Sequence, residues 1–251
     1  MEVPIKLKVH FPSPKVEYEI PSYFKRLEVY IKELKLTNQR FIDRMHVMKR
    51  KIIEREREFA GQEYEKKVFS LKNISGGATD FELNLYFKTY FFIFRQATDS
   101  VMTIIYLLRD RLQTKKGEYQ IINGAKPGRF IKFMVHLFNE KYNNFDSQLM
   151  DYLKQEAELL IIPRIIRNQI KMLGTIPAVI INDEIFRFYI PISKFLVKKD
   201  KTFPLISLID ISKISDKGNL IIIPEYLSVC IKFMENLVNN LNHKYQTLPN
   251  K

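Results

Sequence analysis

The chain of 251 residues carries 41 Lys and Arg residues against 28 Asp and Glu residues, a formal net charge of +13 at pH 7. With 46% hydrophobic residues it is long enough to bury a core, and its single cysteine excludes an intrachain disulfide or a multi-cysteine zinc site. The basic balance favours a phosphate-bearing partner, although a protein from a lysine-rich proteome would show the same balance without one.

Two features of the sequence bear on its compartment. The opening MEVPIKLKVH alternates and carries lysines, so it is not a secretory leader, and the longest apolar stretch, residues 88–108, contains Arg95 and Asp99. The sequence therefore predicts a cytoplasmic protein that does not contact a membrane. The lone Cys230 lies in the apolar run SVCIKFM, which predicts an inert thiol in the core.

The N-terminal part predicts an extended segment followed by two helices. Residues 1–21 alternate at 5–9 like an exposed strand and then carry three prolines, so we expect them to be extended up to a helix N-cap at Ser22. Thr37 predicts the N-cap of a second, longer helix that is heavily charged. The apolar positions of these helices have helical spacing: Phe24, Leu27, Ile31, Leu34, Phe41, Met45, Met48 and Ile52.

Three further helices are predicted up to residue 175. The first spans residues 80–112, begins with a capping box of Thr79 and Glu82, and carries an aromatic group typical of a core. After a polar, glycine-rich linker, a short helix covers residues 129–141. Another begins near Asp146, is interrupted by Pro163 and ends at Gly174. The aromatic group consists of Tyr86, Phe87, Tyr90, Phe91 and Phe94.

The periodicity changes after residue 175. AVIINDEIFRFYIPI predicts a hairpin turning at Asn182-Asp183, two more strand-like runs follow at 204–212 and 219–223, and Pro224 begins a closing helix that ends near Tyr245. The predicted fold is mainly α: an up-and-down helical bundle with a small β-hairpin or sheet insertion before the last helix. We divide the single domain into residues 1–21, 22–175, 176–223 and 224–251.

The stretch RIIRNQIKMLGT, residues 164–175, is the candidate binding site. Arg164, Arg167, Asn168 and Lys171 fall on one arc of a helical wheel, and isoleucines occupy the opposite arc. An arginine grips phosphate oxygens through two donors, and asparagine adds a donor and an acceptor. The stripe predicts a seat for RNA or a nucleotide, whereas the structural alternative is the solvent-facing side of an amphipathic helix.

A long helix, an aromatic helix with FRQATDSV and a later helix with IRNQIK resemble the HEPN superfamily over about residues 37–175 and the last helix. The resemblance implies a compact helical dimer that cleaves RNA without metal, using an arginine and a histidine four to six residues later. Arg167 and Asn168 match the Arg-Asn pair of that motif. Residues 172–174, however, are Met, Leu and Gly, so the histidine that would move protons is absent.

Four other residues enter the site prediction. Arg129 and His136 lie seven residues apart on one helix face and are the alternative catalytic candidates. Arg95 and Asp99, at i and i+4 in an aromatic helix, form either a structural ion pair or, as the resemblance implies, a second layer that orients Arg164 or Arg167. No phosphate-binding loop and no histidine cluster with metal-ligand spacing occurs, so we expect neither cofactor nor metal.

Three functions remain open. The first is a non-catalytic or weakly catalytic HEPN-like protein that binds RNA or a nucleotide through the Arg-Asn helix. The second is an active metal-independent ribonuclease of the toxin or defence type, which would use Arg129 and His136 or an unusual Lys171. The third is a dimeric scaffold that binds a protein partner and no nucleic acid. In each case we expect a homodimer.

Overall fold

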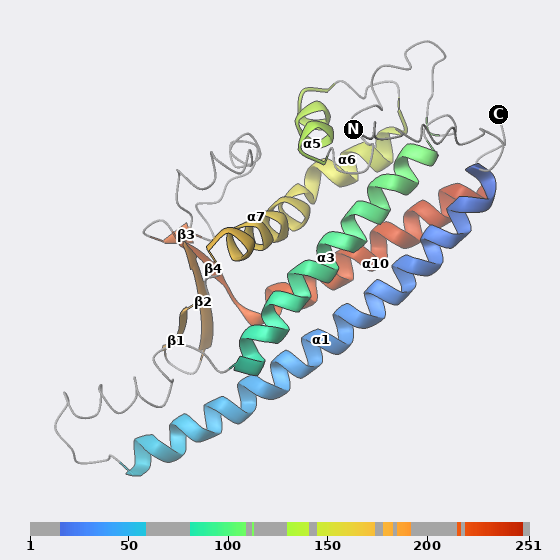
Figure 1. The fold of residues 1–251 in the computed structure, drawn as a ribbon. Coiled ribbons are helices and arrows are strands. Elements are labelled where there is room, and N and C mark those ends of the chain that lie inside the picture. The colour runs from blue at the N-terminus through green and yellow to red at the C-terminus, as the bar shows by residue number, and fades with distance from the viewer. Residues whose placement is uncertain are drawn as a thin grey trace, which may run out of the picture.

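The computed structural model describes residues 16–58, 81–108, 112, 130–140, 145–173, 178–182, 185–191, 215–216 and 219–247. They form a mainly helical bundle with a small antiparallel sheet before the last helix (Figure 1), which confirms the predicted fold class. The predicted strand at residues 5–9, the capping residue Thr79, the helix end at Gly174 and the strand at 204–212 lie outside the described residues.

The first helix differs from the prediction. Helix α1 (Val16–Glu58) is continuous for 43 residues, so residues 16–21 are not extended, Ser22 is not an N-cap and the chain does not break at Thr37. The Ser22 hydroxyl donates to the Glu19 carbonyl one turn back. Thr37 is itself buried between apolar positions on either side of it. Because the apolar stripe runs on past Pro21 and Thr37, packing of that stripe outweighs both local break signals.

Helix α3 (Phe81–Leu107) packs on α1 in the opposite direction. The Phe41 and Phe87 ring centroids are 5.8 Å apart, and one turn further along α1 the Arg44 guanidinium lies 2.9 Å from the Glu82 carboxylate. The aromatic residues Phe87, Tyr90, Phe91 and Phe94 are buried, as their spacing predicts. This aromatic face is the centre of the core.

The last helix, α10 (Pro224–Thr247), closes the bundle beside α1 and α3 (Figure 1). The Asn38 amide donates to the Ser228 hydroxyl at 3.0 Å, and the Phe24 and Tyr245 rings lie 5.9 Å apart, so α10 runs antiparallel to α1. Buried in the same interface, the Tyr90 hydroxyl donates to the Leu227 carbonyl at 2.6 Å. This hydrogen bond ties α3 to the first turn of α10.

Among the described residues, three shorter helices lie between α3 and the sheet: α5 (Phe130–Phe138), α6 (Ser147–Gln155) and α7 (Ala157–Leu173). Asp146 caps α6 by accepting from the Leu149 amide at 2.9 Å, and its other carboxylate oxygen accepts from Lys244 of α10 at 2.6 Å. The predicted interruption at Pro163 is wrong. The helix breaks at Glu156 instead, and α7 runs through Pro163 because the residues on both sides of it are buried and held by packing.

The sheet contains β1 (Ala178–Asn182), β2 (Ile185–Pro191), β3 (Ser215–Asp216) and β4 (Asn219–Ile222), in the order β1-β2-β4-β3. Asn182 pairs with Ile185, so Asn182, the first residue of the predicted turn, belongs to β1, and Asp183 lies outside the described residues. Ile190 and Leu220 pair across β2 and β4 and are both buried, which anchors the sheet to the bundle. Among the described helices, none has the length and apolar character needed to span a membrane.

Replacing Tyr90 by phenylalanine tests the link between α3 and α10. Tyr90→Phe leaves the buried Leu227 carbonyl without its donor, so we expect the free energy of unfolding to fall by about 1–3 kcal/mol. Denaturant titration followed by circular dichroism measures it. Tyr86→Phe, at a half-buried position on the same helix, is the matched control and should change stability much less. Equal effects of the two substitutions would contradict the assignment.

Cys230 provides a second test of the core. Its side chain is fully buried on α10, and burial raises the pKa of the thiol to about 12. Since only the thiolate attacks a disulfide reagent, we expect almost no reaction of the native protein at about pH 8. In denaturant the single thiol should titrate fully. Fast labelling of the native protein would show that this part of the bundle is open to solvent.

Candidate functional site

The candidate site lies where α7 crosses α3. The two helices run in opposite directions, because Asp99 lies beside Arg164 and Phe92 lies beside Arg167. We call the side chains at this crossing the α3–α7 seam. They comprise Lys88, Phe92, Arg95 and Asp99 of α3 and Arg164, Arg167, Asn168 and Lys171 of α7.

One end of the seam is an ion cluster. The Arg95 Nε lies 2.6 Å from Asp99 Oδ2, and the Arg164 Nη1 lies 3.7 Å from Asp99 Oδ1. Arg164 is 9% exposed, and its guanidinium lies 4.8 Å from the centroid of the buried Phe130 ring of α5. A single carboxylate therefore faces two arginines, and a buried arginine has both a charge partner and an aromatic ring against it.

In the middle of the seam an arginine lies against an aromatic ring. The Arg167 guanidinium lies 5.2 Å from the centroid of the Phe92 ring, and its Nη1 donates to Asn168 Oδ1 at 2.9 Å. Arg167 is partly exposed and Phe92 is 41% exposed, whereas Asn168 is buried. Phe92 and Asn168 thus both contact the guanidinium of a partly buried arginine.

The other end of the seam is basic. Lys171 is exposed and follows Arg167 by about one turn of α7. Lys88 is half-buried and precedes Phe92 by about one turn of α3, so the antiparallel arrangement brings it to the same end. Lys88 and Lys171 thus add positive charge to the end of the seam beyond Phe92 and Arg167.

A helical wheel places the four residues of the predicted stripe on one face of the helix, but two of these residues are buried in the structure. Arg164 and Asn168 are less than one-tenth exposed, and Asp99 of α3 and Phe130 of α5 lie against Arg164. Only Arg167 and Lys171 of the predicted four remain within reach of a ligand. Arg95 and Asp99 do join the same cluster, through Arg164.

Phe92 was not among the predicted site residues. The buried aromatic residues Phe87, Phe91 and Phe94 lie on one face of α3, and Phe92 is on the opposite face. Helical periodicity therefore places Phe92 away from the buried face, and from this position the sequence could have predicted an exposed aromatic residue. Its contact with Arg167 depends on where α7 crosses and has no counterpart in the sequence.

The alternative catalytic pair is described only in part. His136 is half-buried on α5, and Arg129 lies outside the described residues. Within the part of the chain that the structure describes, no group of three or more His, Cys, Asp or Glu side chains is placed to hold a metal ion.

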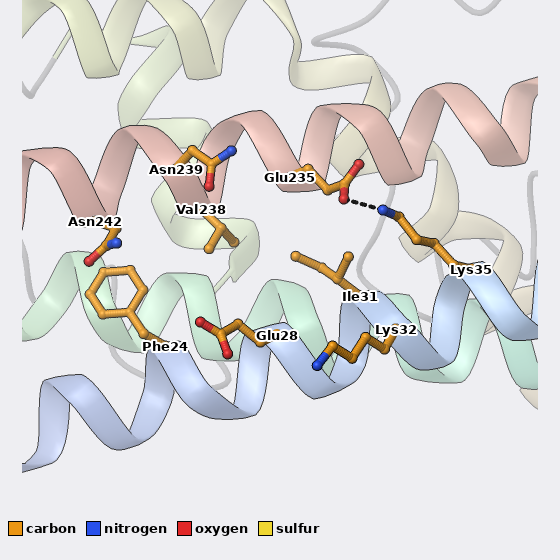
Figure 2. A pocket seen from close by; sticks show the side chains of 9 residues that line it. All are labelled: Phe24, Glu28, Ile31, Lys32, Lys35, Glu235, Val238, Asn239 and Asn242. Carbon is orange, nitrogen blue, oxygen red and sulfur yellow. Dashed lines mark ion pairs between the residues drawn. The ribbon is translucent and has the colours of Figure 1, made fainter.

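A separate groove lies between α1 and α10 (Figure 2) and has a volume of about 260 Å³. Phe24, Ile31 and Val238 provide its apolar surface, and Lys35 pairs with Glu235 across it. The remaining lining residues are polar: Glu28, Lys32, Asn239 and Asn242. No seam residue lines this groove, so it is not part of the candidate site.

Replacing Asp99 by asparagine tests the ion cluster. Asp99→Asn removes the charge that faces Arg95 and the buried Arg164, so we expect the free energy of unfolding to fall by about 1–3 kcal/mol. Asp43→Asn, at an exposed position on α1 that also accepts a side-chain hydrogen bond, is the control and should cost less than about 0.5 kcal/mol. Urea denaturation measures both, and an unchanged Asp99→Asn variant would show that the cluster contributes nothing to stability.

Comparisons with protein-family models, with curated proteins and with solved structures found no match to this chain.

Proposed function

We propose that the protein binds RNA or a nucleotide through the exposed part of the α3–α7 seam and does not cut it. The observation that carries the proposal is the partly exposed Arg167, whose guanidinium lies 5.2 Å from the centroid of the exposed Phe92 ring. A planar guanidinium in a fixed position meets the geometry of a phosphate group with two donors. Lys171 adds a second positive charge one turn away.

The ion cluster supports this proposal by giving the buried residues a role. Arg164 and Asn168 are buried, and each contacts a charged residue of the seam: Arg164 contacts Asp99, and Asn168 accepts from Arg167. We therefore assign Arg167 and Lys171 to ligand contact and Arg164, Asn168, Arg95 and Asp99 to positioning. The overall charge of +13 would attract a polyanion to this surface.

The proposal of binding without cleavage rests on the motif. In the HEPN superfamily, which the chain resembles, catalysis needs a histidine after the Arg-Asn pair, and residues 172–174 provide none. Neither Met nor Leu exchanges protons, and a lysine base would need a strongly lowered pKa. We keep the HEPN relationship as part of the proposal.

A scaffold that binds a protein partner is the second candidate. Phe81 and Leu85 are exposed on α3, and with Phe92 they follow one another at helical spacing. Exposed apolar side chains in such a row are typical of a surface that contacts another protein, including a second copy of the chain in the expected homodimer.

The first experiment measures binding of a mixed-sequence RNA by fluorescence anisotropy at low and moderate salt. We expect binding that weakens steeply with salt, because bound phosphates release counterions. Arg167→Ala should weaken binding by roughly tenfold and lower the slope of the salt dependence by about one. Lys171→Ala should have a smaller effect in the same direction.

Two control variants match these changes elsewhere on the bundle. Arg26→Ala removes an arginine that stacks on an aromatic ring of α1, Tyr23, at 5.3 Å, and Lys232→Ala removes an exposed lysine of α10. Both should bind RNA nearly as wild type. If all four variants lose the same affinity, binding comes from net charge and the seam is not the site. If the wild-type protein binds neither RNA nor a nucleotide, the second candidate function, a scaffold that binds a protein partner, is favoured.

A cleavage assay in the presence of a chelator tests the ribonuclease alternative. We expect intact RNA with wild-type protein. Cleavage that disappears in His136→Ala and in Arg129→Ala would overturn the proposal that the protein is non-catalytic and would move the site to α5 and the residue before it.

A further inference from the structure

We infer that the groove between α1 and α10 binds a small zwitterionic ligand of dipeptide size, at a site separate from the α3–α7 seam. The groove has a volume of about 260 Å³, which suits a ligand smaller than a typical drug molecule. Its apolar floor consists of Phe24, Ile31 and Val238, each less than one-tenth exposed. Polar side chains from both helices border this floor (Figure 2). The inference does not depend on the proposed function.

An ion pair crosses the groove at one end. Lys35 of α1 and Glu235 of α10 contact each other there, and Phe24 and Asn242 lie at the opposite end (Figure 2). Because the charges of Lys35 and Glu235 are matched to each other, they attract an ionic ligand only weakly. Recognition of a charged ligand therefore falls to the side chains between the two ends of the groove.

Glu28 and Lys32 provide the charges in this middle part, and both are exposed. They are four residues apart on α1 with the glutamate first, which is the favourable order for an ion pair on a helix. Among the residues that the structure describes, however, neither of them has an ion-pair partner. The Glu28 carboxylate is thus available to an ammonium group of a ligand, and the Lys32 ammonium is available to a carboxylate.

Two carboxamides lie opposite these charges. Asn239 and Asn242 extend from α10 toward α1 (Figure 2), and the antiparallel arrangement of the helices places them across the groove from residues 28–32. A carboxamide both donates and accepts hydrogen bonds, as a peptide group does. The α10 side of the groove is therefore suited to an amide in the middle of a ligand.

The spacing of the two charges selects the length of the ligand. Four residues of an α-helix rise by about 6 Å, and an extended dipeptide spans at most about 7 Å. The charged groups of a free amino acid are closer together, and an extended tripeptide reaches about 10 Å. In a dipeptide the ammonium faces Glu28, the carboxylate faces Lys32, and an apolar side chain lies on the floor.

The test uses the dipeptide alanyl-leucine as the probe. Isothermal titration calorimetry measures its affinity, and the methyl signals of Ile31 and Val238 in NMR spectra should shift on binding, because these side chains form the floor. N-acetyl-alanyl-leucine lacks the ammonium and alanyl-leucinamide lacks the carboxylate. Each should bind roughly two- to fivefold more weakly, the range expected for one exposed charge pair. Free leucine and alanyl-alanyl-leucine should also bind more weakly.

Matched substitutions assign each end of the ligand. Glu28→Gln should weaken binding of the dipeptide about as much as N-acetylation does, and the two changes together should cost no more than one. Lys32→Gln should have the same relation to amidation of the carboxylate. Glu33→Gln and Lys25→Gln alter exposed residues of α1 that do not line the groove, so they should bind as wild type. Circular dichroism verifies that each variant folds.

The results also distinguish this site from the seam. Arg167→Ala should bind the dipeptide as wild type, whatever its effect on RNA. Absence of methyl shifts at millimolar dipeptide would overturn the inference and leave the proposed function untouched. Equal affinity for the dipeptide and its two blocked forms, or equal losses in the groove variants and the control variants, would overturn it as well.

Discussion

Helix α3 packs against other helices on two of its sides, and the rest of the structure depends on this packing. Its aromatic face packs against α1 and α10, where Phe87 and Tyr90 are buried. Another side meets α7, where Asp99 and Phe92 contact arginines. Rotation of α3 about its axis would expose aromatic side chains of the face toward α1 and α10. The same rotation would bury charged side chains of the side toward α7. The orientation of α3 therefore fixes both the core and the seam.

The crossing of α3 and α7 divides the arginines of α7 into two kinds. Arg164 points into the bundle, where burial of its charge is tolerated because Asp99 and the Phe130 ring lie against it. Arg167, less than one turn later, remains at the surface over Phe92. Two residues of the same type on the same helix thus have different environments, one buried and one partly exposed. The proposed function assigns ligand contact to Arg167 on the basis of this difference in exposure.

Much of the fold follows from local patterns in the sequence. Helical periodicity places α3, α5 and α10 within a few residues of their observed ends, and the alternation after residue 175 predicts the hairpin of β1 and β2. The errors in the helix boundaries share one cause. Ser22, Thr37 and Pro163 carry local signals for a helix start or a break, and at each of them tertiary burial of the apolar stripe continues the helix. A cap or a proline changes the stability of a helix at one position, whereas packing of the apolar stripe adds stabilisation from many residues.

The sequence by itself determined a basic, mainly helical chain with a polar stripe on the helix containing Arg164 and Arg167, because composition and periodicity are properties of local residue order. Only the tertiary structure decided which of those polar residues are buried and that Phe92 lies beneath Arg167. Those two residues are 75 positions apart in the chain, and no spacing rule links them. Their contact arises from the register in which two antiparallel helices pack, and side chains from both helices and from the surrounding core set that register together.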